Sequence, residues 1–538
     1  MKTRAELEQE NAKIQHELAR VRAQLLRKET VIESKKSIIE SKDAFIDQLK
    51  EALILARNRQ FAKATETLRS LQSELFNEAE QEVVVNDDLV QGGAEDDKIT
   101  VLAHERKRSG RKLLPEDLPR VDVIHDLADT DKVCPRDGSP LKLIGEKTSE
   151  QLDIIPMKIQ VIRHIRKHYA CPCCDGYLKT APKPKQPIEK SQASAGLLSY
   201  IAVGKYADSL PLYRQSNILS RFGIDMNRTT LANWMIRCGE LVQPLINRLE
   251  EQLLSYPYLH MDETLLQVLN EVGKSATSNS YMWVRSGSPP GNTVGNRIVL
   301  FNYDASRSGA VPKTLLAGYQ GAIMVDGYEA YEQVCRDQSL VRLGCWVHAR
   351  RKFVEVGKAS GRPPHGRPPR KKKNTQAAYA LKLIAKLYAI EKSLKEATIE
   401  VRHQQRLERS KPIIDKLRTW CDDALIKVPP KTALGKALRY LDNQWLRLIA
   451  YLEDGVYPID NNPVENAIRP FAIGRKNWMF SASVDGAKAS ANLYSLIETA
   501  KANGLEPYAY LKRVFAELPN AKSFDDVDQL LPQEVNDD

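Results

Sequence analysis

The stretch "YLHMDETLLQVL", residues Tyr258–Leu269, reads as a buried β-strand, yet its middle carries His260, Asp262 and Glu263. An ionised carboxylate removed from water is costly unless something compensates its charge. We therefore expect the acid in this strand to be paired locally or to bind a cation. Side chains alternate along a strand, so Glu263 faces away from Asp262 and is left out of the predicted site. His260 shares the face of Asp262, and is either a neighbour of the site or a hydrogen-bonded core histidine.

The segments after this strand follow a recognisable order. Further strand-like runs cover Tyr281–Ser286, Arg297–Tyr303 and Gly321–Val325, and the helix-like "AVPKTLLAGY" precedes the last of them. Three successive strands, a helix and a fourth strand with an acid at its end is the order of a ribonuclease H-like α/β core.

That acid is Asp326 in "GAIMVDGYEAY", and a third candidate is Glu465 in "NNPVENAIRP". Each has a simpler interpretation: Asp326 could cap a helix that starts at Gly327, and Glu465 could complete a capping box with Asn462 or pair with Arg469. Taken together, two acids at strand ends and one on a later helix can converge on a pair of divalent cations. Such a pair promotes in-line displacement at phosphorus.

Residues 5–56 carry a heptad pattern. With Leu7 at position d, six of the seven a positions are aliphatic, which predicts a coiled coil, with Asn11 at the remaining a position favouring a parallel dimer. Lys28, Lys35 and Lys42 at d weaken the middle of the seam. One long helix that packs on its own chain is the alternative.

A cysteine-containing segment predicts a small zinc module. Cys134 in "VCPRDGSPL" and Cys171 and Cys174 in "YACPCCDGYL" have the spacing of zinc ligands. The first knuckle lacks its second cysteine. The fourth ligand could be Asp137, Cys173, His125 or His168, and a degenerate knuckle that only packs is the alternative.

"DSLPLYRQSNILSRFGIDMNRTTLANWMIRCGELV" resembles a helix-turn-helix. Its first helix is expected over 212–221, and Asn227 is expected to cap a second helix that presents Arg228, Thr229 and Asn233 to a DNA groove. A plain helical connector is the alternative.

Composition narrows the class of protein. The 538 residues carry a net charge of +11, and "KASGRPPHGRPPRKKKN" (358–374) holds seven Lys or Arg and no acid, which suits a phosphate backbone. The chain shows neither a run of about 18 apolar residues nor an apolar signal segment at its start, so we expect a cytoplasmic protein without membrane spans.

These blocks together resemble a known family. "HMDET", "VDGYEAY", "CWVHARRKF", "DNNPVENAIRPFAIGRKNWMFS" and "SLIETAKANGLEPYAYL", with the coiled coil and the cysteine module, are similar to transposases of the insertion sequence 66 family, in the wider group of DDE transposases. The resemblance spans nearly the whole chain. The incomplete first knuckle and "RQFAKATETL" depart from the family pattern.

The resemblance implies that Asp262, Asp326 and Glu465 form a DDE triad that holds two Mg²⁺ ions, for which Mn²⁺ can substitute. Zn²⁺ is implied on Cys134, Cys171 and Cys174. Cys345 and His348 of "CWVHARRKF" match an element found after the second Asp in related transposases, and packing is the role favoured for them. The residues expected to contact DNA are Arg228, Thr229, Asn233, Arg350, Arg351, Lys352, Arg367, Arg370, Arg475 and Lys476.

The fold expected is a multidomain α/β protein in which a ribonuclease H-like core with an all-helical insertion follows a coiled coil, a zinc-binding-like module and a helix-turn-helix-like region. The boundaries expected are 1–76 coiled coil, 77–120 acidic linker and basic arm, 121–185 zinc module, 186–255 DNA-binding helices, 256–350 first part of the core, 351–457 insertion, 458–485 third-acid helix and 486–538 C-terminal region.

The expected activity is cleavage at insertion-sequence ends followed by strand transfer into target DNA. The partners expected are DNA, a second copy of the chain through the coiled coil, and small accessory proteins of the same element. The competing interpretations are a ribonuclease H-like nuclease or resolvase without strand transfer, and a non-catalytic dimeric DNA-binding protein.

Overall fold

The computed structural model describes residues 158–170, 178–290, 296–359 and 376–534, with isolated residues between 17 and 139. Residues 1–88 and 168–538 form one compact unit, and residues 89–167 form another. Described residues between Glu17 and Ile46 are helical and exposed, but most of the heptad lies outside the described residues, as do the linker and the basic arm. Among the described residues, no helix is both long and apolar enough to cross a membrane.

A mixed sheet forms the centre of the first unit. Its strands are β3 (Tyr258–Asn270), β4 (Asn279–Gly287), β5 (Ile298–Asp304), β6 (Ala322–Val325) and β7 (Val341–Gly344), in the order β5-β4-β3-β6-β7. The β3–β4 and β4–β5 pairs are antiparallel, whereas β3–β6 and β6–β7 are parallel.

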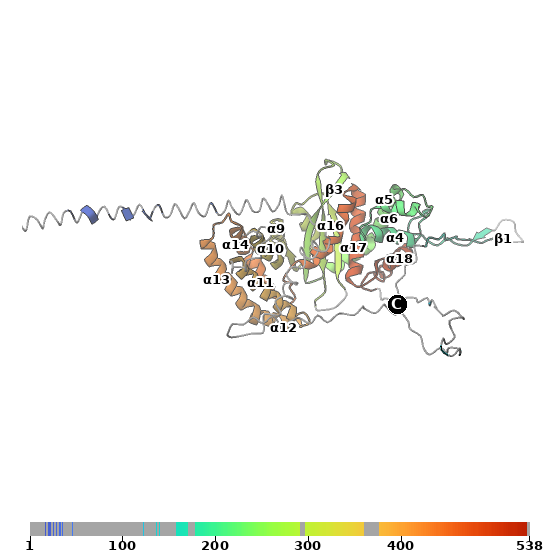
Figure 1. Cartoon of the computed structure of the whole chain (residues 1–538). Coiled ribbons are helices and arrows are strands. Elements are labelled where there is room, and N and C mark those ends of the chain that lie inside the picture. Colours follow the sequence, from blue (N-terminus) through green and yellow to red (C-terminus); the bar gives the residue numbers. More distant parts are fainter. Residues whose placement is uncertain are drawn as a thin grey trace, which may run out of the picture. The chain divides into compact units, whose positions relative to one another are not determined.

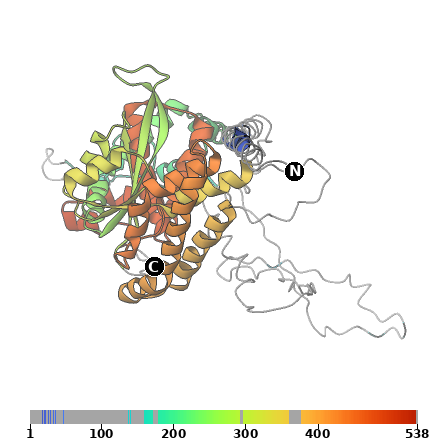
Figure 2. The ribbon, with the colours of Figure 1, turned by 90° about the vertical axis from the view of Figure 1, so that its left-hand side faces the viewer.

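The four strand-like runs of the sequence are confirmed. β7 and the short β8 (Ser481–Ser483), which pairs with the far end of β3, were missed. They have four and three residues, too few to establish a period in the sequence. The hairpin of β3 and β4 extends beyond the surrounding helices, as Figures 1 and 2 show.

Four helices that precede the sheet in the sequence include the predicted helix-turn-helix. They are α4 (Ala195–Tyr206), α5 (Leu212–Ser220), α6 (Arg228–Leu241) and α7 (Gln243–Leu253). Gly223, with φ of 77°, allows the turn between α5 and α6, because this backbone conformation is strained for other residues. Asn227 caps α6, since its side chain accepts a hydrogen bond from the amide of Thr230 at 2.8 Å.

The C-terminal helices share the hydrophobic core of α4–α7. They are α16 (Asn462–Trp478), α17 (Val484–Ala502), α18 (Pro507–Glu517) and the short α19 (Phe524–Asp528). α17 packs on β5 and α6, and α18 packs on α4. Ser495 and Thr499 of α17 bond the backbone of β5, which ties this helix to the sheet edge.

The helices of the predicted insertion form a second layer. They are α11 (Gln376–Ser393), α12 (Ile399–Gln405), α13 (Lys411–Lys427), α14 (Ala433–Asn443) and α15 (Trp445–Ile449), preceded by α10 (Trp346–Ala359), which begins five residues before the predicted start at 351. In Figure 1, α10, α11, α13 and α14 lie on the other side of β3 from α4–α6.

The side chains of β6 alternate between two hydrophobic cores. Ile323 and Val325 join the core beneath α4–α7 and α16–α18, whereas Ala322 and Met324 join the core beneath α10–α15. The helical insertion therefore shares a core with the sheet and is not an independent bundle. A separate hairpin of β1 (His168–Ala170) and β2 (Leu178–Thr180) lies at the end of the predicted zinc module.

Candidate functional site

The parallel pairing of β3 and β6 brings the first two acids side by side. The pairs Tyr258–Ala322, Leu259–Ile323 and His260–Met324 share an offset of 64 residues (322 minus 258). The pairing stops at His260–Met324, and the same offset continued two residues further would set Asp262 opposite Asp326, the residue directly after β6. Neighbouring parallel strands lie about 4.8 Å apart, so the Asp262 carboxyl on β3 and the Asp326 carboxyl at the end of β6 are neighbours.

Asp326 lies in a tight turn and does not cap a helix. Its Oδ1 accepts a hydrogen bond from the backbone amide of Tyr328 at 2.9 Å. The next helix, α9 (Ala330–Gln338), begins four residues after Asp326, and its N-cap residue is Glu329. The predicted alternative that Asp326 caps a helix starting at Gly327 is therefore wrong. The second carboxylate oxygen of Asp326 is available to a ligand.

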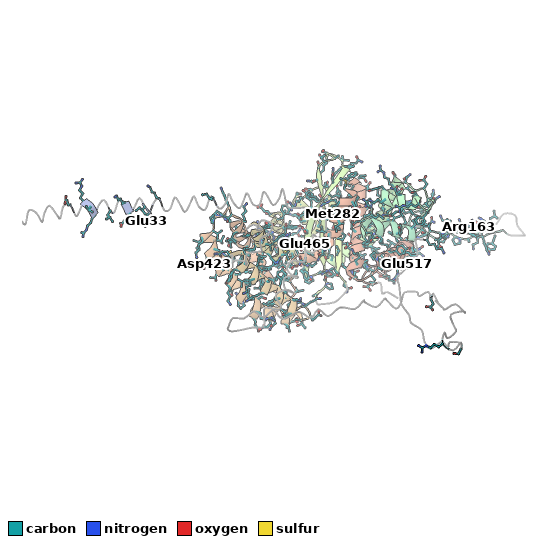
Figure 3. The ribbon with its side chains drawn as sticks, in the orientation of Figure 1. Glu33, Arg163, Met282, Asp423, Glu465 and Glu517 are labelled. Carbon is teal, nitrogen blue, oxygen red and sulfur yellow. The ribbon has the colours of Figure 1, made fainter. Side chains whose placement is uncertain are left out.

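Glu465 belongs to the first turn of α16, where the chain re-enters the core after the insertion (Figure 3). Its side chain is only 5% exposed and meets two groups of α10: Nη2 of Arg351 lies 3.3 Å from Oε2, and Nδ1 of His348 lies 3.6 Å from Oε1. The N-cap of α16 is Asn461, without a side-chain capping bond. The capping-box alternative for Glu465 is therefore wrong, and its ion-pair partner is Arg351, where the sequence suggested Arg469.

The three acids form one electrostatic cluster. Burial raises the pKa of Asp262 well above its usual value, and the charges of Glu263, Asp326 and Glu465 raise it further. Burial also raises the pKa of Glu465, against the opposing effect of Arg351. Clustered carboxylates with raised pKa values are typical of sites that bind cations, because a cation removes the repulsion.

The donor set fits hard divalent cations. Carboxylate oxygens are the ligands that Mg²⁺ and Mn²⁺ prefer. Within the described part of the chain, Oε1 of Glu465 is buried without a hydrogen-bond partner, which is unfavourable unless a ligand satisfies it. An ion shared by Asp262, Asp326 and Glu465 would satisfy this oxygen and offset the burial of Asp262.

Cys345 and His348 lie next to Glu465. Their ligand atoms and a Glu465 oxygen all lie within 4.8 Å of one another. The Sγ of Cys345 accepts a hydrogen bond from the amide of Asn461 at 3.3 Å, and burial holds the pKa of this thiol well above its usual value. Its burial, with 2% exposure, agrees with the packing role expected for Cys345.

Asn461 joins the strand of the first acid to the helix of the third. Its Nδ2 donates to the carbonyl of Met261 at 3.1 Å, so its Oδ1 faces His260 and accepts from Nδ1–H at 3.0 Å. Burial, followed by the charge of Arg297, lowers the pKa of His260 to about 3, so the ring is neutral at ordinary pH. His260 is therefore a hydrogen-bonded core histidine, the second of the two interpretations that the sequence allowed.

Glu263 turns away from the cluster, as the alternation of β3 predicts. Its Oε1 pairs with Arg307 at 2.5 Å, and its Oε2 accepts from the hydroxyl of Tyr331 at 2.7 Å. The guanidinium of Arg307 in turn lies 4.1 Å from the ring centroid of Tyr328. Glu263 thus anchors the segment after Asp326 to β3.

The expected DNA contacts fall into different environments. Arg228, Thr229 and Asn233 are exposed on α6, and Lys476 is exposed on α16. Arg350 is only 3% exposed, so the prediction that it contacts DNA does not agree with its burial. Arg367 and Arg370 lie outside the described residues.

Three further predicted contacts are engaged with the protein itself. Arg351 pairs with Glu465, and Nζ of Lys352 lies 5.7 Å from the ring centroid of Tyr440. Arg475 donates to the carbonyl of Leu265 and, at 3.2 Å, to the hydroxyl of Thr264. The bonds of Arg351 and Arg475 use donors that a phosphate contact would need, whereas the contact of Lys352 with the ring does not use its N–H donors.

The predicted zinc ligands Cys134, Cys171 and Cys174 lie outside the described residues. Cys171 and Cys174 fall in sequence between β1 and β2. His168, one of the candidates for the fourth ligand, stands on β1, and its Nδ1 lies 2.7 Å from the hydroxyl of Thr180.

Sequence reasoning missed several residues that surround the acids. Asn461, Arg307, Arg342 and Glu332 had no role assigned from the sequence. Asn461 stands in the block "DNNPVENAIRP" beside the third acid, which was a usable signal. Arg307 and Arg342 stand in unremarkable local sequence, and only the packing of β7 and of the loop after β5 brings them to the site.

Comparisons with known proteins agree on one family. Residues 190–489 match the model described as "Transposase IS66 family", and residues 495–533 match its "IS66 C-terminal element". Residues 131–175 match the "zinc-finger binding domain of transposase IS66", and residues 48–123 match "Transposase C of IS166 homeodomain".

Relatives from Sinorhizobium fredii (strain NBRC 101917 / NGR234) are similar over most of their length. The uncharacterized protein y4jD is 34% identical over 84% of this chain and 86% of its own length. The uncharacterized protein y4qI is 32% identical over 72% of this chain and 71% of its own, and y4hP is 28% identical over 88% and 85%. From the family model and these relatives, the chain belongs to the IS66 transposase family.

Proposed function

We propose that this chain cleaves DNA at the ends of an insertion sequence and joins those ends to target DNA, with Asp262, Asp326 and Glu465 as the catalytic acids. The observation that carries the proposal is the parallel pairing of β3 with β6, which brings Asp262 on β3 beside Asp326 directly after β6, with Asp326 and Glu465 both close enough to raise the pKa of Asp262. The family match supports the same activity.

We also propose that the core is ribonuclease H-like. The order β5-β4-β3-β6-β7, with β4 antiparallel to its neighbours and β6 and β7 parallel to β3, supports this assignment. So does the position of the acids, since the first stands on the central strand, the second directly follows the neighbouring strand, and the third stands on a helix packed against the sheet.

The three acids are suited to hold two divalent cations, Mg²⁺ or Mn²⁺. When bound, such a pair would activate the attacking oxygen and stabilise the leaving oxygen at phosphorus. Asp262 would bind from β3, Asp326 from the turn after β6 and Glu465 from α16. Arg351 holds Oε2 of Glu465, which leaves Oε1 available to a cation.

Both cleavage by water and attack by a 3′ hydroxyl are displacements at phosphorus, so one carboxylate site serves both without a covalent intermediate on the protein. The exposed face of α6, with Arg228, Thr229 and Asn233, is suited to bind a DNA groove. The zinc-finger match favours a second DNA-binding element held by Zn²⁺ on Cys134, Cys171 and Cys174.

The deciding experiment incubates the full-length protein with linear DNA that carries candidate element ends, with Mg²⁺ or with EDTA. The wild type is expected to nick the ends and to form covalently joined products with a target only when Mg²⁺ is present. Asp262→Asn and Glu465→Gln are expected to lose both products while they still shift the DNA in a gel. Nicking by either variant at the wild-type rate would refute the triad.

The same assay separates the competing functions. Nicking without joined products would indicate a nuclease or resolvase. DNA binding without Mg²⁺-dependent nicking in the wild type would indicate a DNA-binding protein without catalysis. Glu355→Gln is the matched control, because Glu355 is an exposed acid on α10, and this variant is expected to nick normally.

A further inference from the structure

We propose that the helical insertion positions the second acid through a chain of three side chains, Arg342, Glu332 and Arg447. Arg342 holds the turn that contains Asp326, Glu332 orients Arg342, and Arg447 supplies the contact from the insertion. The inference rests on the proposed role of Asp326 as a cation ligand. It means that the insertion contributes to the affinity of the site for that cation.

Arg342 holds the turn directly. It stands on β7, paired with Ile323 of β6, and its side chain is only 7% exposed. Its Nη2 donates to the carbonyls of Asp326, at 2.9 Å, and Tyr328, at 3.1 Å. With the bond from the amide of Tyr328 to Oδ1 of Asp326, these contacts fix both ends of the turn. The second terminal nitrogen, Nη1, bonds Glu332 at the same time, and this rigid fork of two nitrogens is what a single ammonium nitrogen lacks.

Glu332 connects Arg342 to the insertion. Its Oε2 accepts from Nη1 of Arg342 at 2.7 Å, and from Nε and Nη2 of Arg447 at 3.0 and 2.6 Å. Partial burial alone would raise the pKa of Glu332, but the bonds from the two arginines outweigh it and lower the pKa below its usual value. The carboxylate is therefore ionised and shared between the core and α15.

The insertion also contacts the turn by close packing. A Cβ added to Gly327, the residue after Asp326, would lie 3.2 Å from the ring of Tyr440 on α14. A Cβ added to Gly344, at the end of β7, would lie 3.0 Å from the amide of Leu448 on α15. α14 and α9 lie on the same side of β3 in Figure 1. The backbone of the Asp326 turn thus has helices of the insertion against it, with the three-residue chain beside this contact.

This arrangement makes the second acid sensitive to the insertion. Groups that orient a cation ligand without touching the cation typically change metal affinity or activity about 10–100-fold when they are removed. The side chain of Asp326 accepts its hydrogen bond from the backbone of Tyr328, so its orientation depends on the turn. Arg342 and Arg447 are positioning residues on this view.

The test uses full-length protein and measures two quantities: Mg²⁺ binding by calorimetry, and the Mg²⁺ concentration that gives half-maximal nicking of end DNA. Arg447→Met is expected to weaken Mg²⁺ binding about tenfold, and Arg342→Met up to about 100-fold, with nicking partly restored at high Mg²⁺. Arg342→Lys is expected to lie between Arg342→Met and the wild type.

Arg418→Met is the matched control. Arg418 is another insertion arginine with carboxylate partners, but it stands on α13 and pairs with Asp422 and Asp442 of the insertion itself. The Arg418→Met protein is expected to bind Mg²⁺ as tightly as the wild type does. The double variant Arg342→Met/Arg447→Met is expected to match Arg342→Met alone, because Arg447 acts through the same carboxylate.

Wild-type Mg²⁺ binding by Arg447→Met, or an equal loss in Arg418→Met, would overturn the proposal. Arg447 is more exposed than Arg342, so this variant keeps the test valid if Arg342→Met fails to fold. Asp326→Ala separates the two claims: if it binds Mg²⁺ and nicks normally, the proposed function is wrong. If it loses both while Arg447→Met is normal, only the positioning role is wrong.

Discussion

Replacement of Asn461 by alanine tests how the first and third acids are held together. The side chain of Asn461 is fully buried and makes two bonds, one to the carbonyl of Met261 and one from Nδ1–H of His260. Alanine leaves that carbonyl and that N–H without these partners in the protein interior. Each buried unsatisfied group costs about 1–3 kcal/mol, so the free energy of unfolding should fall by about 2–6 kcal/mol.

The measurement is urea unfolding of the full-length protein, followed by tryptophan fluorescence, with the m-value compared between variants. Asn466→Ala on the same helix is the control, because Asn466 is exposed and its side chain accepts from Arg469 at 3.0 Å. Its free energy of unfolding should stay within about 0.5 kcal/mol of the wild type.

A second readout concerns the site. Asn461 precedes Glu465 by one helical turn and bonds the residue before Asp262, so its loss should also weaken stabilisation of the protein by Mg²⁺. If the free energy of unfolding of Asn461→Ala lies within about 0.5 kcal/mol of the wild type, the range typical of surface changes, the reasoning that this side chain links the two elements is refuted.

Two further predictions concern packing and zinc. Gly239→Ala should lower the free energy of unfolding by about 1–3 kcal/mol, because its Cβ would lie 2.6 Å from the backbone of Ala489 where α6 crosses α17. The control is Gly357→Ala, whose Cβ would meet nothing within 4 Å and which should raise the free energy of unfolding by up to about 1 kcal/mol. Equal effects of the two substitutions in urea unfolding would contradict this packing argument. Purified protein should contain zinc that elemental analysis can measure, and the Cys174→Ser variant should lose this zinc. Cys421 is a buried cysteine of the insertion, so the control variant Cys421→Ser should keep the zinc. Zinc retained in Cys174→Ser would contradict the ligand assignment.

Much of the fold could be predicted from local sequence, and the family resemblance supplied the proposed set of three acids. The strand Tyr258–Asn270, the helix cap at Asn227 and the two helices that flank Gly223 each follow from a pattern within a few residues. The position of Asp326 at the end of a buried strand was equally local. The alternation of β3 correctly separated Glu263 from Asp262, because side-chain direction along a strand depends only on the period of two.

The surroundings of each acid could not be predicted in this way. The sequence around Glu465 fits a capping box, but the structure turns this side chain toward His348 and toward Arg351, 114 residues earlier in the chain. Arg350 and Arg351 look alike in "CWVHARRKF", yet one is buried and the other meets the third acid. The difference between Arg350 and Arg351 depends on which face of α10 packs on the core. Helices from the insertion set that face.

The sequence by itself determined the longer elements and the family, and it proposed the three acids, because these depend on short-range periodicity and on residues that stand in recognisable blocks. Only the tertiary structure decided that β3 and β6 pair in parallel at an offset that aligns Asp262 with Asp326, and that Arg342 and Arg447 share Glu332 beside that turn. Contacts between segments far apart in the chain depend on how whole faces bury against each other, and local sequence carries little of that information.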